Sequence, residues 1–206
     1  ISEATFSIEK SDMVALVGVS GAGKTTIIDL LLGLYEPELG VITIDGRDLR
    51  EVDICSWRRH IGVVDQDVHL LNTTVNENIR FARLDATNEM IEAAARTAHA
   101  HEFIERLGDG YNTVIGDRGY RLSGGQKQRA TLARAIMRQP RILILDDALS
   151  AVDTHTEEAI LRYLRGATTD CTTIIIAHRI STLRAADQIV VLDEGRIAEW
   201  GDHDTL

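Results

Sequence analysis

The strongest chemical signal in the sequence is a glycine-rich segment that ends in a lysine and two threonines. Its residues are Gly18, Val19, Ser20, Gly21, Ala22, Gly23, Lys24, Thr25 and Thr26. The glycines allow backbone angles that a side chain would forbid, so that successive amide N–H groups can converge on an anion. Lys24 supplies a mobile positive charge for terminal phosphates, and the hydroxyl group of Thr25 is suited to Mg²⁺. The segment predicts a purine nucleoside triphosphate site, with all of these residues except Val19 at the nucleotide.

The residues on either side of this segment favour the same interpretation. The apolar run 13–17 predicts a buried strand, and the run that begins at Ile27 predicts a helix. A strand, a glycine-rich turn and a helix form the context that a phosphate-binding loop requires, and the N-terminus of the helix adds its dipole. The alternative is a chance match in an ordinary turn before a helix, which the flanking elements disfavour.

Two polar segments follow apolar runs that predict strands. The run 142–145 leads to Asp146 and Asp147, and the run 61–64 leads to Asp65 and Gln66. Ligands of open α/β sheets lie at the carboxyl ends of the strands. A carboxylate there suits a Mg²⁺-nucleotide site, so Asp146 is a predicted metal ligand, and Asp147 lies where a general base is needed. The alternative for Asp146 is a solvated acid at the end of a strand.

A second helix start has a phosphate-friendly composition. Ser123 is a good N-cap residue, and two glycines after it let another molecule approach the backbone. The segment runs Leu122, Ser123, Gly124, Gly125 and Gln126. Ordinary helix capping explains these residues equally well, so both interpretations are open for the segment alone.

The rest of the chain predicts how these segments are positioned. Alternating strands and helices imply a mostly parallel sheet with helices on both faces. Strands are expected at 5–8, 13–17, 41–44, 61–64, 141–145, 172–177 and 188–192, and helices at 75–82, 88–100, 125–138, 154–165 and 180–186. The region 72–138 is then a helical insert, and 5–8 with 41–44 an antiparallel β element. Both ends of the chain are expected to cut through elements, as in an excised domain.

Bulk properties limit the classes of function. The 206 residues suffice for one domain of ordinary size, and the net charge of −10 argues against a face that grips nucleic acid through its phosphates. No apolar run approaches the roughly 18 residues of a membrane span. Cys55 and Cys171 have no metal-ligand spacing and are expected to be free thiols in a reducing compartment.

Taken together, these segments resemble the ATP-binding-cassette (ABC) family nearly from end to end. Residues 18–26 resemble its Walker A motif, Gln66 its Q-loop glutamine, 122–126 its signature, 142–146 its Walker B motif, 150–153 its D-loop and His178 its switch histidine. Few other phosphate-loop proteins carry the signature. The segment 113–119 further resembles the one that precedes the signature in ABC exporters and touches the coupling helices of their membrane domain.

The resemblance implies a RecA-like P-loop core, formed by 1–71 and 139–206 with an antiparallel β subdomain, and a helical subdomain at 72–138. It implies an ATPase that uses Mg²⁺ with ATP and drives export through a transmembrane domain, expected upstream in the same polypeptide, at the cytoplasmic face of the cell membrane. Two nucleotide-binding domains would sandwich ATP between Walker A of one and the signature of the other. The residues then expected at the partner's nucleotide are Ser123, Gly124, Gly125, Gln126 and Asp153. Gln66 would contact Mg²⁺ and the attacking water, and His178 the γ-phosphate; each also has an ordinary interpretation as a satisfied polar residue.

Two departures from the family pattern change the expectations. Asp147 occupies the position of the family's catalytic glutamate and is one methylene shorter, so hydrolysis at this chain's own site is expected to be slow. We therefore favour a heterodimer in which this chain binds ATP and completes the partner's site with its signature. The family's adenine-stacking aromatic lies upstream of this chain, and neither Tyr35 nor Tyr120 is at its position.

Three functional hypotheses follow from the sequence. The first is an ATPase that powers export, and the second is a binding module whose nucleotide closes the dimer with negligible hydrolysis. The third, a soluble ABC protein of DNA repair or translation, is disfavoured because no long insertion separates Gln66 from Ser123. A P-loop kinase is disfavoured as well, since no second substrate-binding lid is evident.

Overall fold

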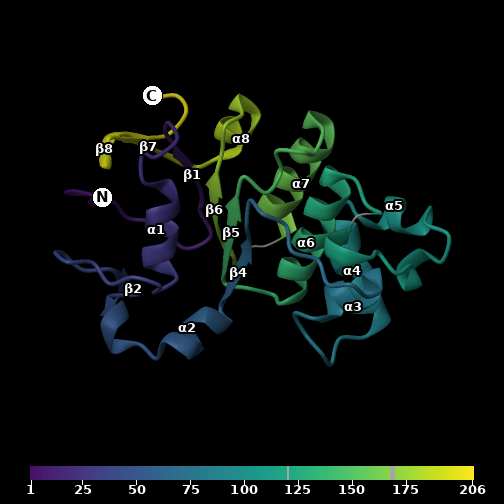
Figure 1. Ribbon diagram of the computed structural model, residues 1–206. Coiled ribbons are helices and arrows are strands. Elements are labelled where there is room, and N and C mark those ends of the chain that lie inside the picture. Colours follow the sequence, from purple (N-terminus) through teal and green to yellow (C-terminus); the bar gives the residue numbers. More distant parts are fainter. Residues whose placement is uncertain (120, 168–169) are drawn as a thin grey trace.

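A six-stranded sheet crosses the middle of the molecule in the computed structural model, which describes residues 1–119, 121–167 and 170–206 (Figure 1). The strand order is β4-β5-β6-β1-β7-β8, with all neighbours parallel except β7 and β8. The strands are β1 (Met13–Val17), β4 (Ile61–Val64), β5 (Ile142–Asp146), β6 (Thr172–Ile176), β7 (Gln188–Asp193) and β8 (Arg196–Gly201). The predicted mostly parallel α/β sheet is confirmed.

Helices cover both faces of this sheet, as near-continuous apolar strands require. Successive residues of β5 show the alternation, because Leu143 and Leu145 join one buried cluster and Ile144 the other. Figure 1 shows α1 (Lys24–Leu31) and α2 (Ile54–Arg59) on one side of the sheet and α6 (Gly124–Met137) and α7 (Thr154–Ala167) on the other. A short helix, α8 (Ile180–Ala185), packs beside α7.

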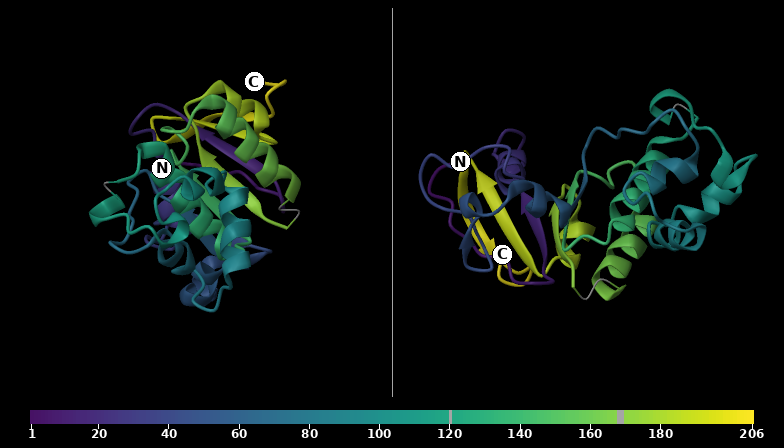
Figure 2. Two further views of the ribbon diagram at one scale, coloured as in Figure 1. Left: turned by 90° about the vertical axis from the view of Figure 1, so that its right-hand side faces the viewer. Right: turned by 90° about the horizontal axis from the view of Figure 1, so that it is seen from below.

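The helical region between β4 and β5 lies at the end of the molecule remote from β8, as the right-hand view of Figure 2 shows. Its helices are α3 (Val75–Arg80), α4 (Asn88–Thr97), α5 (His101–Glu105) and α6, with single 3-10 turns η2 (Gly110–Asn112) and η3 (Asp117–Gly119) before α6. Thr74 and Thr87 cap α3 and α4 through their hydroxyl oxygens. The predicted segment 113–119 includes the second of these turns.

The structure corrects several sequence-based predictions. Residues 5–8 form no strand; Phe6 and Ile8 are half-buried against the cluster on the α1 side, so their alternation reflects packing without strand pairing. The strand expected at 41–44 is reduced to β2 (Thr43–Ile44), which pairs with β3 (Arg47–Asp48) in a two-stranded hairpin. The antiparallel β element therefore consists of this hairpin, and the first of its two predicted parts is wrong.

Other differences concern where helices end and which elements sequence patterns missed. The helix expected at 88–100 ends at Thr97, since His99 has a φ of 50°, and a separate helix begins at His101. Two elements have no counterpart among the predicted ones: α2, which buries only Trp57, and the edge strand β8. A further 3-10 turn, η1 (Leu49–Glu51), precedes α2.

Candidate nucleotide-binding site

Four of the predicted site segments meet at one edge of the sheet. Gln66 follows β4, Asp146 ends β5, His178 follows β6, and the glycine-rich loop follows β1. These four strands are consecutive neighbours and all parallel, so their carboxyl ends share that edge. The topology therefore brings together segments that are up to 160 residues apart, at the place where open α/β sheets bind ligands.

The glycine-rich loop between β1 and α1 depends on its glycines. Gly18 has a φ of 154°, and a Cβ atom there would lie 2.2 Å from the carbonyl oxygen of Leu192, so only glycine fits. Gly23, at the N-cap of α1, has a φ of 104°. No side chain caps the first turn of α1, so its N–H groups stay available to an anion. Ser20, Thr25 and Thr26 are exposed around this helix start.

Lys24 is held inside the loop. Its side chain is only 8% exposed, and its Nζ donates hydrogen bonds to the carbonyl oxygens of Gly18 at 2.7 Å and Val19 at 2.9 Å. Neutral carbonyls satisfy the donors without neutralising the charge. A phosphate oxygen can replace these carbonyls with a charge-assisted hydrogen bond, which is roughly twice as strong as a neutral one.

Carboxylates surround the predicted metal position. Burial raises the pKa of Asp146 above its ordinary 3.8, the charges of Asp65 and Asp147 raise that pKa further, and Lys24 opposes them. Asp29 on α1 adds a smaller contribution in the same direction. The mutual repulsion of these carboxylates costs free energy, and a bound cation would reduce that cost. Asp29 and Asp65 were not among the predicted site residues, although Asp65 directly follows β4.

The residues present fit Mg²⁺ in chemistry. Thr25 offers a hydroxyl oxygen and Asp146 a carboxylate, and Mg²⁺ prefers such oxygen ligands, completed by waters and phosphate oxygens. Gln66, which is exposed, could add an amide oxygen. Among the described residues no three His, Cys, Asp or Glu side chains group closely enough to hold a metal ion by themselves.

Asp147 and His178 line the same small cavity, of about 70 Å³. Asp147 has a φ of 48°, a left-handed conformation that Asp tolerates better than most residues. Next to His178, Arg179 donates hydrogen bonds to the carbonyl oxygens of Val152 at 2.8 Å and Ser150 at 2.6 Å. Arg179 also pairs with Glu157, whose side chain is almost fully buried in α7. Arg179, the residue after His178, is thereby tied to the loop that follows Asp147.

The second predicted helix start is a capping box. The hydroxyl oxygen of Ser123 accepts from the amide of Gln126 at 3.3 Å, and the side chain of Gln126 accepts from the amide of Ser123 at 2.9 Å. Capping is thus observed, and it leaves the hydroxyl proton of Ser123 able to donate. Asp153 caps α7 in the same manner, since its carboxylate accepts from the amide of Thr156, which lowers the pKa of Asp153.

The signature segment does not join the glycine-rich loop of its own chain. α6, which begins directly after Ser123, lies across the sheet from α1 (Figure 1). The edge of the sheet therefore assembles the predicted Walker A, Walker B, Q-loop and switch residues, whereas the signature lies at the start of α6, on the other side of the sheet from α1.

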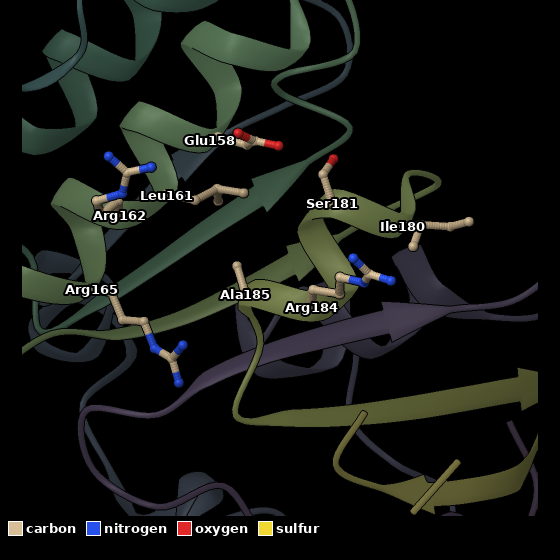
Figure 3. Close-up of a pocket in the computed structure, with 8 residues that line it drawn as sticks. All are labelled: Glu158, Leu161, Arg162, Arg165, Ile180, Ser181, Arg184 and Ala185. Carbon is tan, nitrogen blue, oxygen red and sulfur yellow. The ribbon is translucent and has the colours of Figure 1, made fainter. Parts of the chain in front are cut away.

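A larger cavity than the one that Asp147 and His178 line lies elsewhere, between α7 and α8 (Figure 3). It has a volume of about 430 Å³ and three arginines, Arg162, Arg165 and Arg184, in its lining. None of the predicted phosphate-binding or metal-binding residues lines it. This cavity therefore does not mark the predicted nucleotide site.

Neither Tyr35 nor Tyr120 is expected at the base-stacking position. Tyr35 is 64% exposed, and Tyr120 lies outside the described residues. Both predicted free thiols remain unpaired, with Cys55 exposed and Cys171 buried. Burial raises the pKa of the Cys171 thiol to about 11, so this thiol is unreactive at neutral pH.

Comparisons with known proteins agree with this arrangement. The sequence model of the family described as ABC transporter matches residues 1–150. The chain is 48% identical to the mouse protein named mitochondrial potassium channel ATP-binding subunit, which it matches over its whole length while spanning 29% of that protein. It is also 48% identical to the ATP-dependent lipid A-core flippase of Vibrio cholerae, matching over its whole length and spanning 36% of the flippase.

A solved structure matches the fold closely. It is described as the structure of a bacterial Atm1-family ABC exporter with ATP bound, and it superimposes with a TM-score of 0.94 at 46% sequence identity. The match covers 98% of this chain and 35% of the exporter chain. The chain thus spans about a third of the proteins that it resembles. None of the helices in its described part has the length and apolarity of a membrane span.

The chain belongs to the ABC transporter family, as a nucleotide-binding ATPase domain homologous to exporters of the Atm1 and lipid A flippase kind.

Proposed function

We propose that this chain binds Mg²⁺-ATP at the carboxyl edge of its sheet and uses ATP-driven dimerisation to power export across a membrane. The observation that carries the proposal is the uncapped start of α1 beside a buried Lys24 and the half-buried carboxylate of Asp146. The positive end of the α1 dipole and the charge of Lys24 would attract the phosphates, and the carboxylate of Asp146 would attract the cation. The nucleotide would be held by Gly18, Ser20, Gly21, Ala22, Gly23, Lys24, Thr25 and Thr26, with Mg²⁺ at Thr25, Gln66 and Asp146.

The two separated helix starts support a two-subunit site. A nucleotide on α1 cannot reach Ser123 of the same chain, because α6 lies across the sheet. We propose that the partner's nucleotide receives Ser123, Gly124, Gly125, Gln126 and Asp153. In this chain the capping box prepares Ser123 for that role, since its hydroxyl still has a proton to donate. ATP would then close the dimer by binding to both subunits.

Hydrolysis at this site depends on Asp147, with Gln66 and His178 as its proposed helpers. Asp147 follows β5 and His178 follows β6, so both lie at the carboxyl edge of the sheet where the phosphate loop follows β1, and they line one small cavity there. The shorter side chain sets the carboxylate back from the position of a glutamate. We therefore also propose the alternative of a slow site, in which this chain binds ATP and its signature completes the faster site of a different partner.

The remaining context of the domain is proposed from the relatives. The chain spans only part of each relative, so we place a transmembrane domain in the same polypeptide and the nucleotide-binding domain at the cytoplasmic face of the cell membrane. The segment 113–119 is the proposed contact with that membrane domain. We also retain the proposed division into a core, 1–71 and 139–206, and a helical subdomain at 72–138.

The test compares two lysine variants of the assembled transporter. Lys24→Ala removes the buried charge inside the loop, and Lys10→Ala removes an exposed lysine that pairs with Asp170. Equilibrium binding of ATP with Mg²⁺, followed by ATP turnover, should show binding or turnover abolished in the first variant and unchanged in the second. Unchanged affinity together with unchanged turnover in Lys24→Ala would refute the assignment of the loop.

A further inference from the structure

The loop between β5 and α7 carries Asp147 at one end and Asp153 at the other, and a glutamine from α6 holds its middle. The side chain of Gln128 is 5% exposed. Its Nε2 donates to the carbonyl oxygen of Asp147 at 3.3 Å and to Ser150 Oγ at 3.1 Å, and its Oε1 accepts from the amide of Ala151 at 2.9 Å. One side chain of α6 thus makes three hydrogen bonds to one loop.

We propose that Gln128 is a positioning residue for Asp147, and that it couples the signature helix to this chain's own hydrolytic carboxylate. The proposal rests on the function proposed above and adds a connection between two sites. Ser123, at the start of α6, is proposed to contact the partner's nucleotide, whereas Asp147 serves the nucleotide of its own chain. Gln128 is one turn of helix from Gly124 and joins the two.

The backbone of Asp147 needs such support. Its left-handed φ of 48° costs energy that the surroundings must supply. Its carbonyl oxygen accepts from the amide of Ser150 at 3.2 Å, from Ser150 Oγ at 2.9 Å and from Gln128. The first two bonds come from within the loop, so Gln128 is the contact that fixes the carbonyl relative to α6. Loss of that contact frees the peptide to relax and moves the carboxylate.

The orientation of the Gln128 amide is determined by its partners. A backbone amide such as that of Ala151 can only donate, and the carbonyl oxygen of Asp147 can only accept. Reversal of the side-chain amide would break both contacts at once. The Gln128 side chain therefore fixes two points of the loop relative to each other: its Nε2 binds the carbonyl oxygen of Asp147, and its Oε1 binds the amide of Ala151.

Close packing makes the connection stiff. A Cβ atom on Gly125 would lie 2.6 Å from the carbonyl oxygen of Ala151, so the first turn of α6 and the loop are already in contact. A displacement of α6 at the signature then moves the loop with it, because neither side has room to yield. On the other side of the loop, Arg179 holds the carbonyl oxygens of Ser150 and Val152.

The main test replaces Gln128 with methionine, which keeps the length of the side chain and removes all three hydrogen bonds. The matched control is Thr131→Val on the same helix, because Thr131 is 8% exposed and donates only to the carbonyl oxygen of Lys127. In the assembled transporter, single-turnover ATP hydrolysis should fall about tenfold in Gln128→Met, since small displacements of a reacting group cost up to about 10²-fold. The ATP dissociation constant should stay within threefold, and Thr131→Val should change neither quantity.

A second variant separates the contacts. Gln128→Glu keeps an acceptor for the amide of Ala151 but, when ionised, has no proton to donate to the carbonyl of Asp147. It should lose turnover as Gln128→Met does. In hydrogen exchange, the amide of Ala151 should lose protection in Gln128→Met and keep it in Gln128→Glu. This exchange measurement needs no nucleotide, so it reports on the loop independently of ATP binding.

The outcomes distinguish the two proposals. A wild-type protein that binds no ATP overturns the proposed function, whatever the Gln128 variants do. ATP binding with turnover within threefold of wild type in Gln128→Met or Gln128→Glu overturns the positioning role alone. The positioning role is also overturned if Thr131→Val loses as much turnover as Gln128→Met. It is likewise overturned if Gln128→Met weakens ATP binding instead of slowing turnover, because general destabilisation would then explain the effect.

Discussion

Replacement of Asp147 by glutamate tests how the length of one side chain limits hydrolysis. The added methylene carries the carboxylate towards the terminal phosphate by about the 1 Å that separates good from poor alignment, a difference that can change rates about 10²-fold. A well-placed general base contributes about 10²- to 10⁴-fold in total. We therefore expect single-turnover hydrolysis in the assembled transporter to rise between about 10- and 100-fold in Asp147→Glu.

The same substitution should carry a small cost in stability. Asp147 adopts a φ of 48°, which short polar side chains tolerate and glutamate tolerates less well. The variant should lose up to about 1 kcal/mol of unfolding free energy in the nucleotide-free state. Asp147→Asn is the matched control, because asparagine keeps the length and the tolerance of this conformation while removing the carboxylate. It should not lower stability, because it also removes the charge that repels Asp146, and it should reduce the residual hydrolysis.

Two results would refute this account of Asp147. The first is a lack of acceleration in Asp147→Glu although ATP binding is retained, which would mean that side-chain length does not limit the reaction. The second is hydrolysis by Asp147→Asn at the wild-type rate, which would mean that the carboxylate is not the base. A rise with glutamate and a fall with asparagine is the pattern that the structure predicts.

Two further predictions concern residues around the site. Burial and nearby carboxylates raise the pKa of Asp146 above 3.8, so ionisation disfavours the folded state and stability falls as pH rises from 3.8 through that raised pKa. At pH 7 and without nucleotide, Asp146→Asn should therefore raise the melting temperature, and this increase should shrink as the pH falls towards 3.8. The same variant should abolish Mg²⁺-dependent ATP turnover. A lower melting temperature of Asp146→Asn at pH 7 would contradict the electrostatic argument. Gly125→Ala should lower the melting temperature and ATP-driven dimerisation, because its Cβ would lie 2.6 Å from a backbone oxygen. The control Gly108→Ala, whose Cβ would meet nothing within 4 Å, should be nearly neutral. Equal effects of the two variants in calorimetry and sedimentation would refute this.

Much of the fold could be predicted because its strands are uniformly apolar. The five parallel strands bury both faces, so each appears in the sequence as a short apolar run bounded by polar residues. Elements with one exposed side were missed. β8 is an edge strand with mostly exposed residues, and the six-residue helix α2 buries only Trp57. The alternation at 5–8 was misleading because pairing depends on a neighbouring strand, which local sequence does not show.

Some residues of the site could likewise be predicted from the sequence, and others could not. The glycine-rich loop and Asp146 carry their chemistry in residue type and spacing, so sequence alone could place them at an edge of the sheet. Gln128 and Arg179 hold backbone carbonyl and amide groups of a loop that is remote in sequence. Backbone partners leave no mark on residue identity, so only the three-dimensional structure shows what these two side chains do.

The most direct test of the central claim is a structure of the assembled dimer with ATP and Mg²⁺, determined under conditions that prevent hydrolysis. We predict that Nζ of Lys24 leaves the carbonyl oxygens of Gly18 and Val19 and binds the terminal phosphates, with Ser123 of the second subunit donating to the same nucleotide. A nucleotide bound at this loop while Ser123 of every subunit faces solvent would contradict the account, as would a Lys24 side chain that keeps its carbonyl partners.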